Sequence, residues 1–143
     1  MRSCNPYYKY YPQKTKENEE ILLYWDRTFY TYKTMAHNRP DITLHDKMGK
    51  IAYLIDIAVP NTNNVHKTVQ HKISKYAELA VEIEKQWKTK VQIIPIVIST
   101  TGLIPKTTVQ NVYKLGGTIR EIQLMQKAVI LHTTKILRGF VGE

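Results

Sequence analysis

Hydrophobic side chains recur at helical spacing in several segments of this 143-residue chain. The first of these segments also places acidic residues in its opening turn, where the helix dipole favours them. The longest one carries an apolar stripe that ends at Trp87. The patterns predict four helices, over residues 17–33, 65–87, 107–115 and 121–137.

Three further apolar segments have the pattern of strands. Residues 41–45 alternate, whereas residues 50–59 are almost wholly apolar, which is typical of a central strand. Residues 46–49 read as a turn between them. Residues 91–99 form a third strand, in which Pro95 favours an edge position or a bulge.

The order of these elements predicts an α/β fold with a mixed β-sheet core flanked by helices. We expect residues 17–143 to form a single domain, because no internal linker or repeat interrupts them. Residues 1–16 contain two prolines and several tyrosines without any period. We predict that they form an extended N-terminal arm or docking segment.

The charge of the chain narrows the choice of partner. Lys and Arg number 21 against 12 Asp and Glu, a formal net charge of +9. Such a balance favours a polyanionic partner, with nucleic acid first and an anionic membrane surface second. The alternative is a basic soluble protein whose charge is incidental. No apolar run approaches the roughly 18 residues of a membrane span.

A single cysteine, Cys4, limits the covalent chemistry of these residues. One cysteine cannot form an internal disulfide or a Cys-rich zinc site. It fits a reducing compartment, so we expect an intracellular protein.

Two aspartates in the predicted hairpin are the strongest chemical signal. Asp56 lies deep in an apolar strand, where a carboxylate is costly unless it is paired or binds a metal. A two-residue loop at Met48 and Gly49 would set Asp41 opposite Asp56, with Cβ atoms roughly 5 Å apart. A divalent cation would relieve the repulsion between them. Alternatively, Asp41 caps a turn and Asp56 pairs with a buried Lys or Arg.

The helix after the hairpin carries a second signal. Lys72, Lys75, Tyr76 and Leu79 share one helical face. A lysine at the rim of the apolar stripe can bury its stem and direct its ammonium towards a neighbouring site. There it could hold a phosphate, or position or deprotonate a water. A solvated basic face is the alternative interpretation.

These residues together resemble a known nuclease pattern. Arg39-Pro40-Asp41, followed after fourteen residues by Asp56 in an apolar strand, is similar to the PD-(D/E)XK motif. More specifically, the chain resembles the restriction-like endonuclease domain of site-specific non-long-terminal-repeat retrotransposon polyproteins. In that family the lysine lies on the following helix, near a Tyr-x-x-Leu-x-x-Glu run such as Tyr76 to Glu82. Ala58, where the general motif has lysine, is therefore expected.

The resemblance implies a restriction-endonuclease-like fold and metal-dependent hydrolysis of DNA phosphodiester bonds. Mg²⁺ or Mn²⁺ would be bound by Asp41, Asp56 and the backbone carbonyl of Ile57. Lys72 or Lys75 would act on the phosphate, and both remain candidates. Supporting roles fall to Tyr76, Glu82 and, on the first predicted helix, Glu20 or its neighbour Glu19. The candidate DNA contacts are Arg39, Lys67, Lys88 and Lys90.

The resemblance also implies a wider setting. The family's polyproteins carry a reverse transcriptase and a zinc knuckle, which these 143 residues do not contain. DNA as substrate implies a nuclear location. Two rival functions remain, namely a catalytically inactive nucleic-acid-binding remnant of the same fold and a structural interaction domain.

Overall fold

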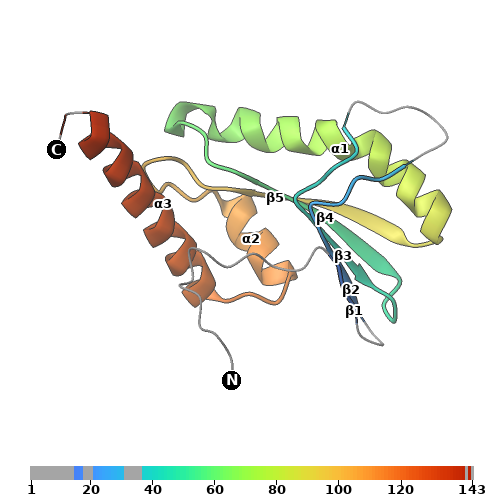
Figure 1. The fold of residues 1–143 in the computed structure, drawn as a ribbon. Coiled ribbons are helices and arrows are strands. Elements are labelled where there is room, and N and C mark those ends of the chain that lie inside the picture. Colours follow the sequence, from blue (N-terminus) through green and yellow to red (C-terminus); the bar gives the residue numbers. More distant parts are fainter. Residues whose placement is uncertain (1–14, 18–20, 31–36, 141, 143) are drawn as a thin grey trace, which may run out of the picture.

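The computed structural model describes residues 15–17, 21–30, 37–140 and 142, and shows a mixed sheet with helices on both faces (Figure 1). This confirms the predicted α/β fold with a mixed β-sheet core flanked by helices. The strands are β1 (Thr15–Glu17), β2 (Ile21–Trp25), β3 (Ile42–Asp46), β4 (Ile51–Ala58) and β5 (Lys90–Val97). The helices are the 3-10 turn η2 (Thr62–Asn64), α1 (Val65–Trp87), α2 (Lys106–Lys114) and α3 (Ile119–Phe140).

The five strands lie in the order β1-β2-β3-β4-β5. The first four are antiparallel neighbours, whereas β4 and β5 are parallel and joined through α1. A parallel pair needs such a crossover connection. Within the described ranges β5 forms one edge of the sheet, as Pro95 predicts, since proline cannot donate to a further strand.

The hairpin of β3 and β4 has the register expected from the sequence. Ile42 pairs with Ile55 at one end and Asp46 pairs with Ile51 at the other. The loop holds four residues, 47–50, in place of the two-residue loop at Met48 and Gly49 considered above. Because both lengths give the same phase, the longer loop leaves the facing residues unchanged.

The first predicted helix is wrong wherever the structure describes it. Residues 15–17 and 21–25 form β1 and β2, and β2 pairs with β3 over its whole length. The apolar run of Ile21 to Trp25 satisfies a helical stripe, but its β-branched and aromatic residues also suit a strand. Pairing with the hairpin supplies the backbone partners that decide between the two. The remaining parts of the predicted helix, residues 18–20 and 31–33, lie outside the described residues.

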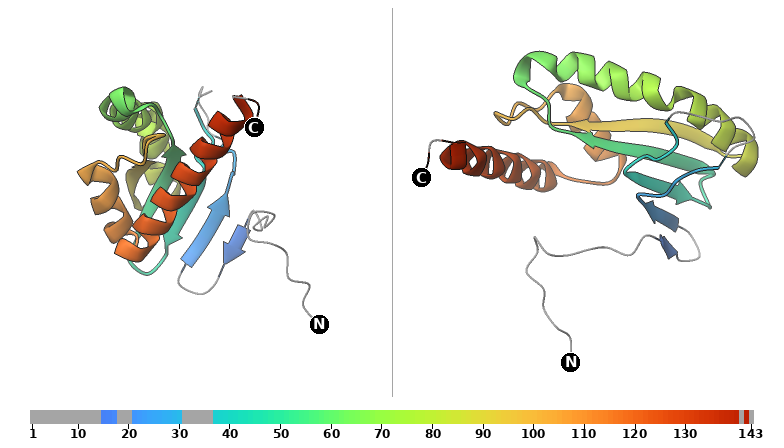
Figure 2. Two further views of the ribbon diagram at one scale, coloured as in Figure 1. Left: turned by 90° about the vertical axis from the view of Figure 1, so that its left-hand side faces the viewer. Right: turned by 45° about the horizontal axis from the view of Figure 1, so that its top comes forward.

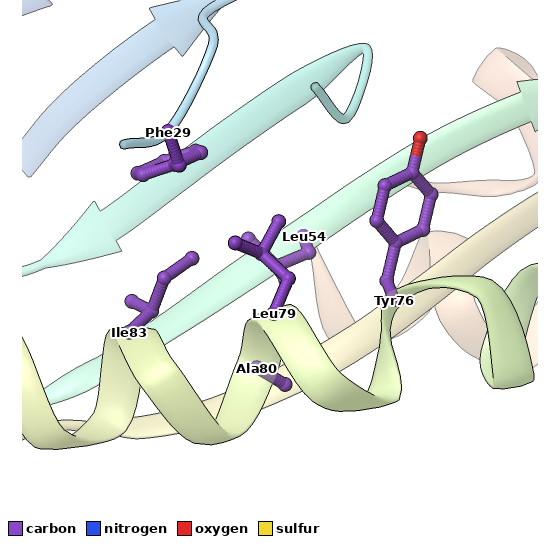
Figure 3. Packing of buried hydrophobic residues seen from close by; sticks show 6 residues of the cluster. All are labelled: Phe29, Leu54, Tyr76, Leu79, Ala80 and Ile83. Carbon is purple, nitrogen blue, oxygen red and sulfur yellow. The ribbon is translucent and has the colours of Figure 1, made fainter. Parts of the chain in front are cut away.

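Helix α1 covers one face of the sheet, and α2 with the start of α3 packs on the other (Figures 1 and 2). The observed bounds of α1 match the predicted ones. The apolar spacing predicts an inward stripe that includes Ile73 and omits Leu79, but Leu79 is fully buried whereas Ile73 is 38% exposed. Figure 3 shows the resulting core between α1 and the sheet, formed by Phe29, Leu54, Tyr76, Leu79, Ala80 and Ile83.

The shifted stripe matters for the site. Val69 and Tyr76 are both buried, and Lys72 lies between them, one turn from each. A lysine therefore occupies an inward position and not the rim. None of the helices in the described ranges is long and apolar enough to cross a membrane.

Candidate functional site

The two aspartates of the hairpin meet through their backbones as well as their side chains. The amide of Asp41 donates a hydrogen bond to Asp56 Oδ1 at 3.3 Å. The amide of Ile57 donates to Asp41 Oδ2 at 2.8 Å. Asp41 directly precedes β3 and so continues the register to a position facing Asp56. The predicted carboxylate pair is therefore present, and Ile57 contacts it with its amide.

Lys72 completes the cluster from α1. Its Nζ lies 2.6 Å from Asp56 Oδ2, and the two side chains are only 17% and 4% exposed. No described residue gives Oδ2 a directed hydrogen bond, so the contact with Nζ is mainly ionic. Val69 and Tyr76, one turn before and one turn after Lys72 on α1, are both buried, so the stem of Lys72 leaves the inward face of the helix. Of the two candidate lysines, the structure brings this one to the carboxylates.

Tyr76 joins the same cluster through its hydroxyl. The hydroxyl donates to the carbonyl oxygen of Arg39 at 3.2 Å and lies 3.4 Å from Asp56 Oδ1. Figure 3 shows the ring leaving α1 with its hydroxyl directed away from the helix. Burial, together with the nearby carboxylates of Asp56 and Asp41, raises the pKa of Tyr76. The phenol stays protonated and acts as a donor that fixes the strand end against the helix.

The electrostatics of the pair favour a further cation. Burial is the main cause that raises the pKa of Asp41, and the negative charge of Asp56 raises this pKa further. The hydrogen bond from the amide of Ile57 lowers it. Among the described residues, Lys72 is the cation that contacts this pair, so two carboxylates share a single ammonium. A divalent cation between the carboxylates would stabilise their ionised forms. The donor set of carboxylate oxygens suits Mg²⁺ or Mn²⁺.

Few other ligands are available within the described ranges, where no three His, Cys, Asp or Glu residues cluster in a way that could hold a metal ion. The carboxylates of Asp41 and Asp56, the nearby main chain and water would have to complete the coordination. Glu19 and Glu20, the predicted contributors from the first helix, lie outside the described residues.

Two other predicted site residues lie away from the carboxylates. Lys75 Nζ lies 5.1 Å from the centroid of the Tyr76 ring, and no ion pair joins it to either aspartate. Glu82 pairs with Lys85 at 3.7 Å. It follows Lys72 by about 15 Å along the axis of α1, because each residue adds 1.5 Å. This geometry does not support a direct catalytic role for Lys75 or a supporting role for Glu82.

Arg39 is held by a residue that the sequence did not reveal. Its Nε donates to Asp26 Oδ1 at 2.8 Å, and its terminal nitrogen lies 2.6 Å from Asp26 Oδ2. The amide of Asp26 also donates to the carbonyl oxygen of Asp41 at 2.8 Å. Asp26 thus ties the end of β2 to the site. Interpreting residues 21–25 as a strand would have placed Asp26 beside Asp41.

The remaining candidate DNA contacts lie at opposite ends of the sheet. Lys67 is exposed in the first turn of α1, which packs against the ends of β4 and β5 near the carboxylates. Lys88 and Lys90 are exposed at the other end. Lys90 pairs with Ile51, and five strand residues, about 17 Å, separate that point from Asp56. Only Lys67 and Arg39 lie at the end of the sheet that holds the carboxylates.

No protein-family model, curated protein or solved structure matches this chain.

Proposed function

We propose that this chain is a metal-dependent DNA endonuclease domain of the PD-(D/E)XK type, similar to those of non-long-terminal-repeat retrotransposons. One observation carries the proposal. Asp41, Asp56 and Lys72 come from three separate positions along the chain and converge on one point. The sequence alone predicts all three as candidate catalytic residues, with Lys75 as the alternative to Lys72.

The arrangement of the elements gives further support. A hairpin carries both carboxylates, the next helix carries the lysine, and the strand after that lies parallel to β4. The sheet therefore presents the acids beside the helix that follows them. We include in the proposal the restriction-endonuclease-like fold that the Arg39-Pro40-Asp41 motif implies.

The residues of the site divide the work between them. Asp41 and Asp56 would hold Mg²⁺ or Mn²⁺, with water and the main chain of Ile57 as further contacts. The bound cation would supply Lewis acidity towards the phosphate and a more acidic water. Lys72 has three N–H donors, of which the contact with Asp56 uses one. The others can stabilise negative charge that develops on the phosphate.

The DNA backbone would lie over the same end of the sheet. Lys67 is exposed there, and the Arg39 guanidinium is 52% exposed even in its pair with Asp26. Both can contact phosphates, which positions DNA without reading its sequence. We include in the proposal that reverse transcriptase and zinc-knuckle regions of a polyprotein supply target specificity, and that the domain acts in the nucleus.

A second candidate function has its own observation. The contact of Lys72 with the buried Asp56 is also the structural ion pair that the alternative interpretation predicts. In that case the domain would bind nucleic acid through its positive charge without cutting it. Metal-dependent cleavage separates the two functions.

The test is nicking of supercoiled plasmid by the full chain in Mg²⁺ or Mn²⁺. We expect Asp56→Asn and Lys72→Met each to lower the nicking rate by on the order of 100-fold, the usual scale for losing an electrostatic catalytic group. EDTA should abolish nicking by the wild type.

Two matched variants control this test. Asp46→Asn changes an aspartate at the far end of the same hairpin, and Lys75→Met changes a lysine on the same helix that does not contact the carboxylates. Both should cut like the wild type. Wild-type nicking no faster than that of Asp56→Asn would leave the binding function, which an anisotropy titration in EDTA would then detect.

A further inference from the structure

The oxygens of the carboxylate pair are not equally free. Asp56 Oδ2 contacts the Lys72 ammonium at 2.6 Å and is buried. Asp41 Oδ2 accepts a short hydrogen bond from the amide of Ile57. Within the described ranges Asp56 Oδ1 has two long contacts, at 3.3 and 3.4 Å, and the carboxyl of Asp41 lies within hydrogen-bonding reach of the carboxyl of Asp56. Asp41 Oδ1 and Asp56 Oδ1 are therefore the oxygens best able to take a metal, and they belong to facing residues of the hairpin.

The charge of the cluster sets a second limit. Two carboxylates and one ammonium leave a single negative charge, and the described ranges contain no further acidic, histidine or cysteine cluster to add to it. One divalent cation already reverses the sign of the site. A second one would lie against both the first ion and the ammonium, in a partly dry environment where such repulsion is strong.

The position of Lys72 makes its ammonium hard to displace. The side chain leaves α1 between two buried residues, Val69 and Tyr76, and its covalent attachment keeps the charge beside Asp56. Ions in two-metal sites lie about 3.5–4 Å apart. The Lys72 ammonium contacts Asp56 Oδ2 and so occupies the side of the carboxylate where a second ion would bind.

We propose that this site binds one divalent cation and that the Lys72 ammonium takes the place of the second. This deepens the proposed function and rests on it. Lys72 is then a fixed cation of the site, complementary to a phosphate that bridges it and the metal. Removing its charge would free Asp56 Oδ2 and restore the full negative charge of the pair, so that two ions could bind.

The experiment counts Mn²⁺ bound by the full chain, from the electron paramagnetic resonance signal of free Mn²⁺ during a titration. We expect one Mn²⁺ per chain for the wild type, none for Asp56→Asn and two for Lys72→Met. Lys72→Arg keeps the charge and should bind one, and Lys75→Met, the matched control, should also bind one. If Lys72→Met does not fold by circular dichroism, Lys72→Gln, which also lacks the charge, has the same expected count of two.

Two Mn²⁺ per wild-type chain would overturn the proposal, as would a single ion in a folded Lys72→Met or Lys72→Gln variant. In either case plasmid nicking that depends on Asp56 would leave the proposed function standing. No Mn²⁺ bound by the wild type would overturn both. Counting bound ions and measuring cleavage therefore separate the two failures.

Discussion

The two ends of the β3–β4 hairpin use aspartate in opposite ways. Near the loop, Asp46 Oδ1 accepts a hydrogen bond at 3.0 Å from the amide of Gly49, only three residues away, at an exposed position. At the other end, Asp56 accepts a hydrogen bond from the amide of Asp41, 15 residues away in the sequence. Asp41 in turn accepts one from the amide of Ile57, 16 residues away. A local turn satisfies the first carboxylate, whereas the others depend on the whole fold. A buried carboxylate such as Asp56, whose side chain is 4% exposed, needs a partner from elsewhere in the fold.

The side chains that cover these ends differ as well. At the loop end Trp87 stacks on His45 with ring centroids 4.6 Å apart, and Tyr24 and Phe29 pack around it. Rings of this size bury large apolar areas. At the other end the same helix contributes Lys72 and the hydroxyl of Tyr76. Stability is concentrated where the aromatic rings lie, and charge where the carboxylates lie.

The largest difference in stability should come from breaking the buried ion pair. Lys72→Met leaves a carboxylate that is 4% exposed without its opposite charge, so the free energy of unfolding should fall by about 3 kcal/mol. Asp46→Ala removes an exposed turn contact and should cost about 1 kcal/mol or less. Urea unfolding at pH 7 without divalent metal measures both.

A double variant checks the cause. Lys72→Met with Asp56→Asn removes both charges and keeps an acceptor for the amide of Asp41, so most of the lost stability should return. If Lys72→Met costs no more than Lys75→Met, the ion pair contributes nothing and the contrast between the two ends disappears.

A smaller effect should appear in the pH dependence of the stability of the folded chain. Burial, helped by Asp56, raises the pKa of Asp41 above its ordinary value of 3.8, so the folded chain holds this proton more tightly than the unfolded chain. The resulting stabilisation is complete below pH 3.8 and is lost as the pH rises through the pKa of the folded state. Asp41→Asn never ionises, so without metal its Tm at pH 7 should exceed that of the wild type, by a margin that solvent screening keeps small.

Thermal unfolding at a series of pH values checks the sign. The advantage of Asp41→Asn should shrink as the pH falls towards 3.8, and saturating Mn²⁺ at pH 7 should reverse it by stabilising only the wild type. A difference that stays the same at every pH would show that ionisation of Asp41 is not its cause.

Much of the central framework could be predicted from sequence because its signals are local. The apolar run of β4, the bounds of α1 and the phase of the hairpin depend on neighbouring residues, and all three are confirmed. The facing of Asp41 and Asp56 followed from that phase. The sequence does not decide between Lys72 and Lys75, because the inward face of α1 is set by contact with the sheet.

The errors share a physical cause. Residues 21–25 satisfy both a helical and a strand pattern, and only pairing with β3 selects the strand. The Arg39–Asp26 pair depends on that strand, so it could not be anticipated. Lys88 and Lys90 are predicted as DNA contacts from charge alone, and charge does not reveal at which end of a sheet a residue lies. Their contact with DNA stays a prediction.

A crystal structure of the wild-type chain soaked in Mn²⁺ tests the central claim most directly. The account predicts one anomalous peak in contact with the carboxylates of Asp41 and Asp56, with Lys72 Nζ still against Asp56 Oδ2. Anomalous density absent from this position, with the Lys72–Asp56 pair intact, would contradict it and leave the pair as a structural ion pair.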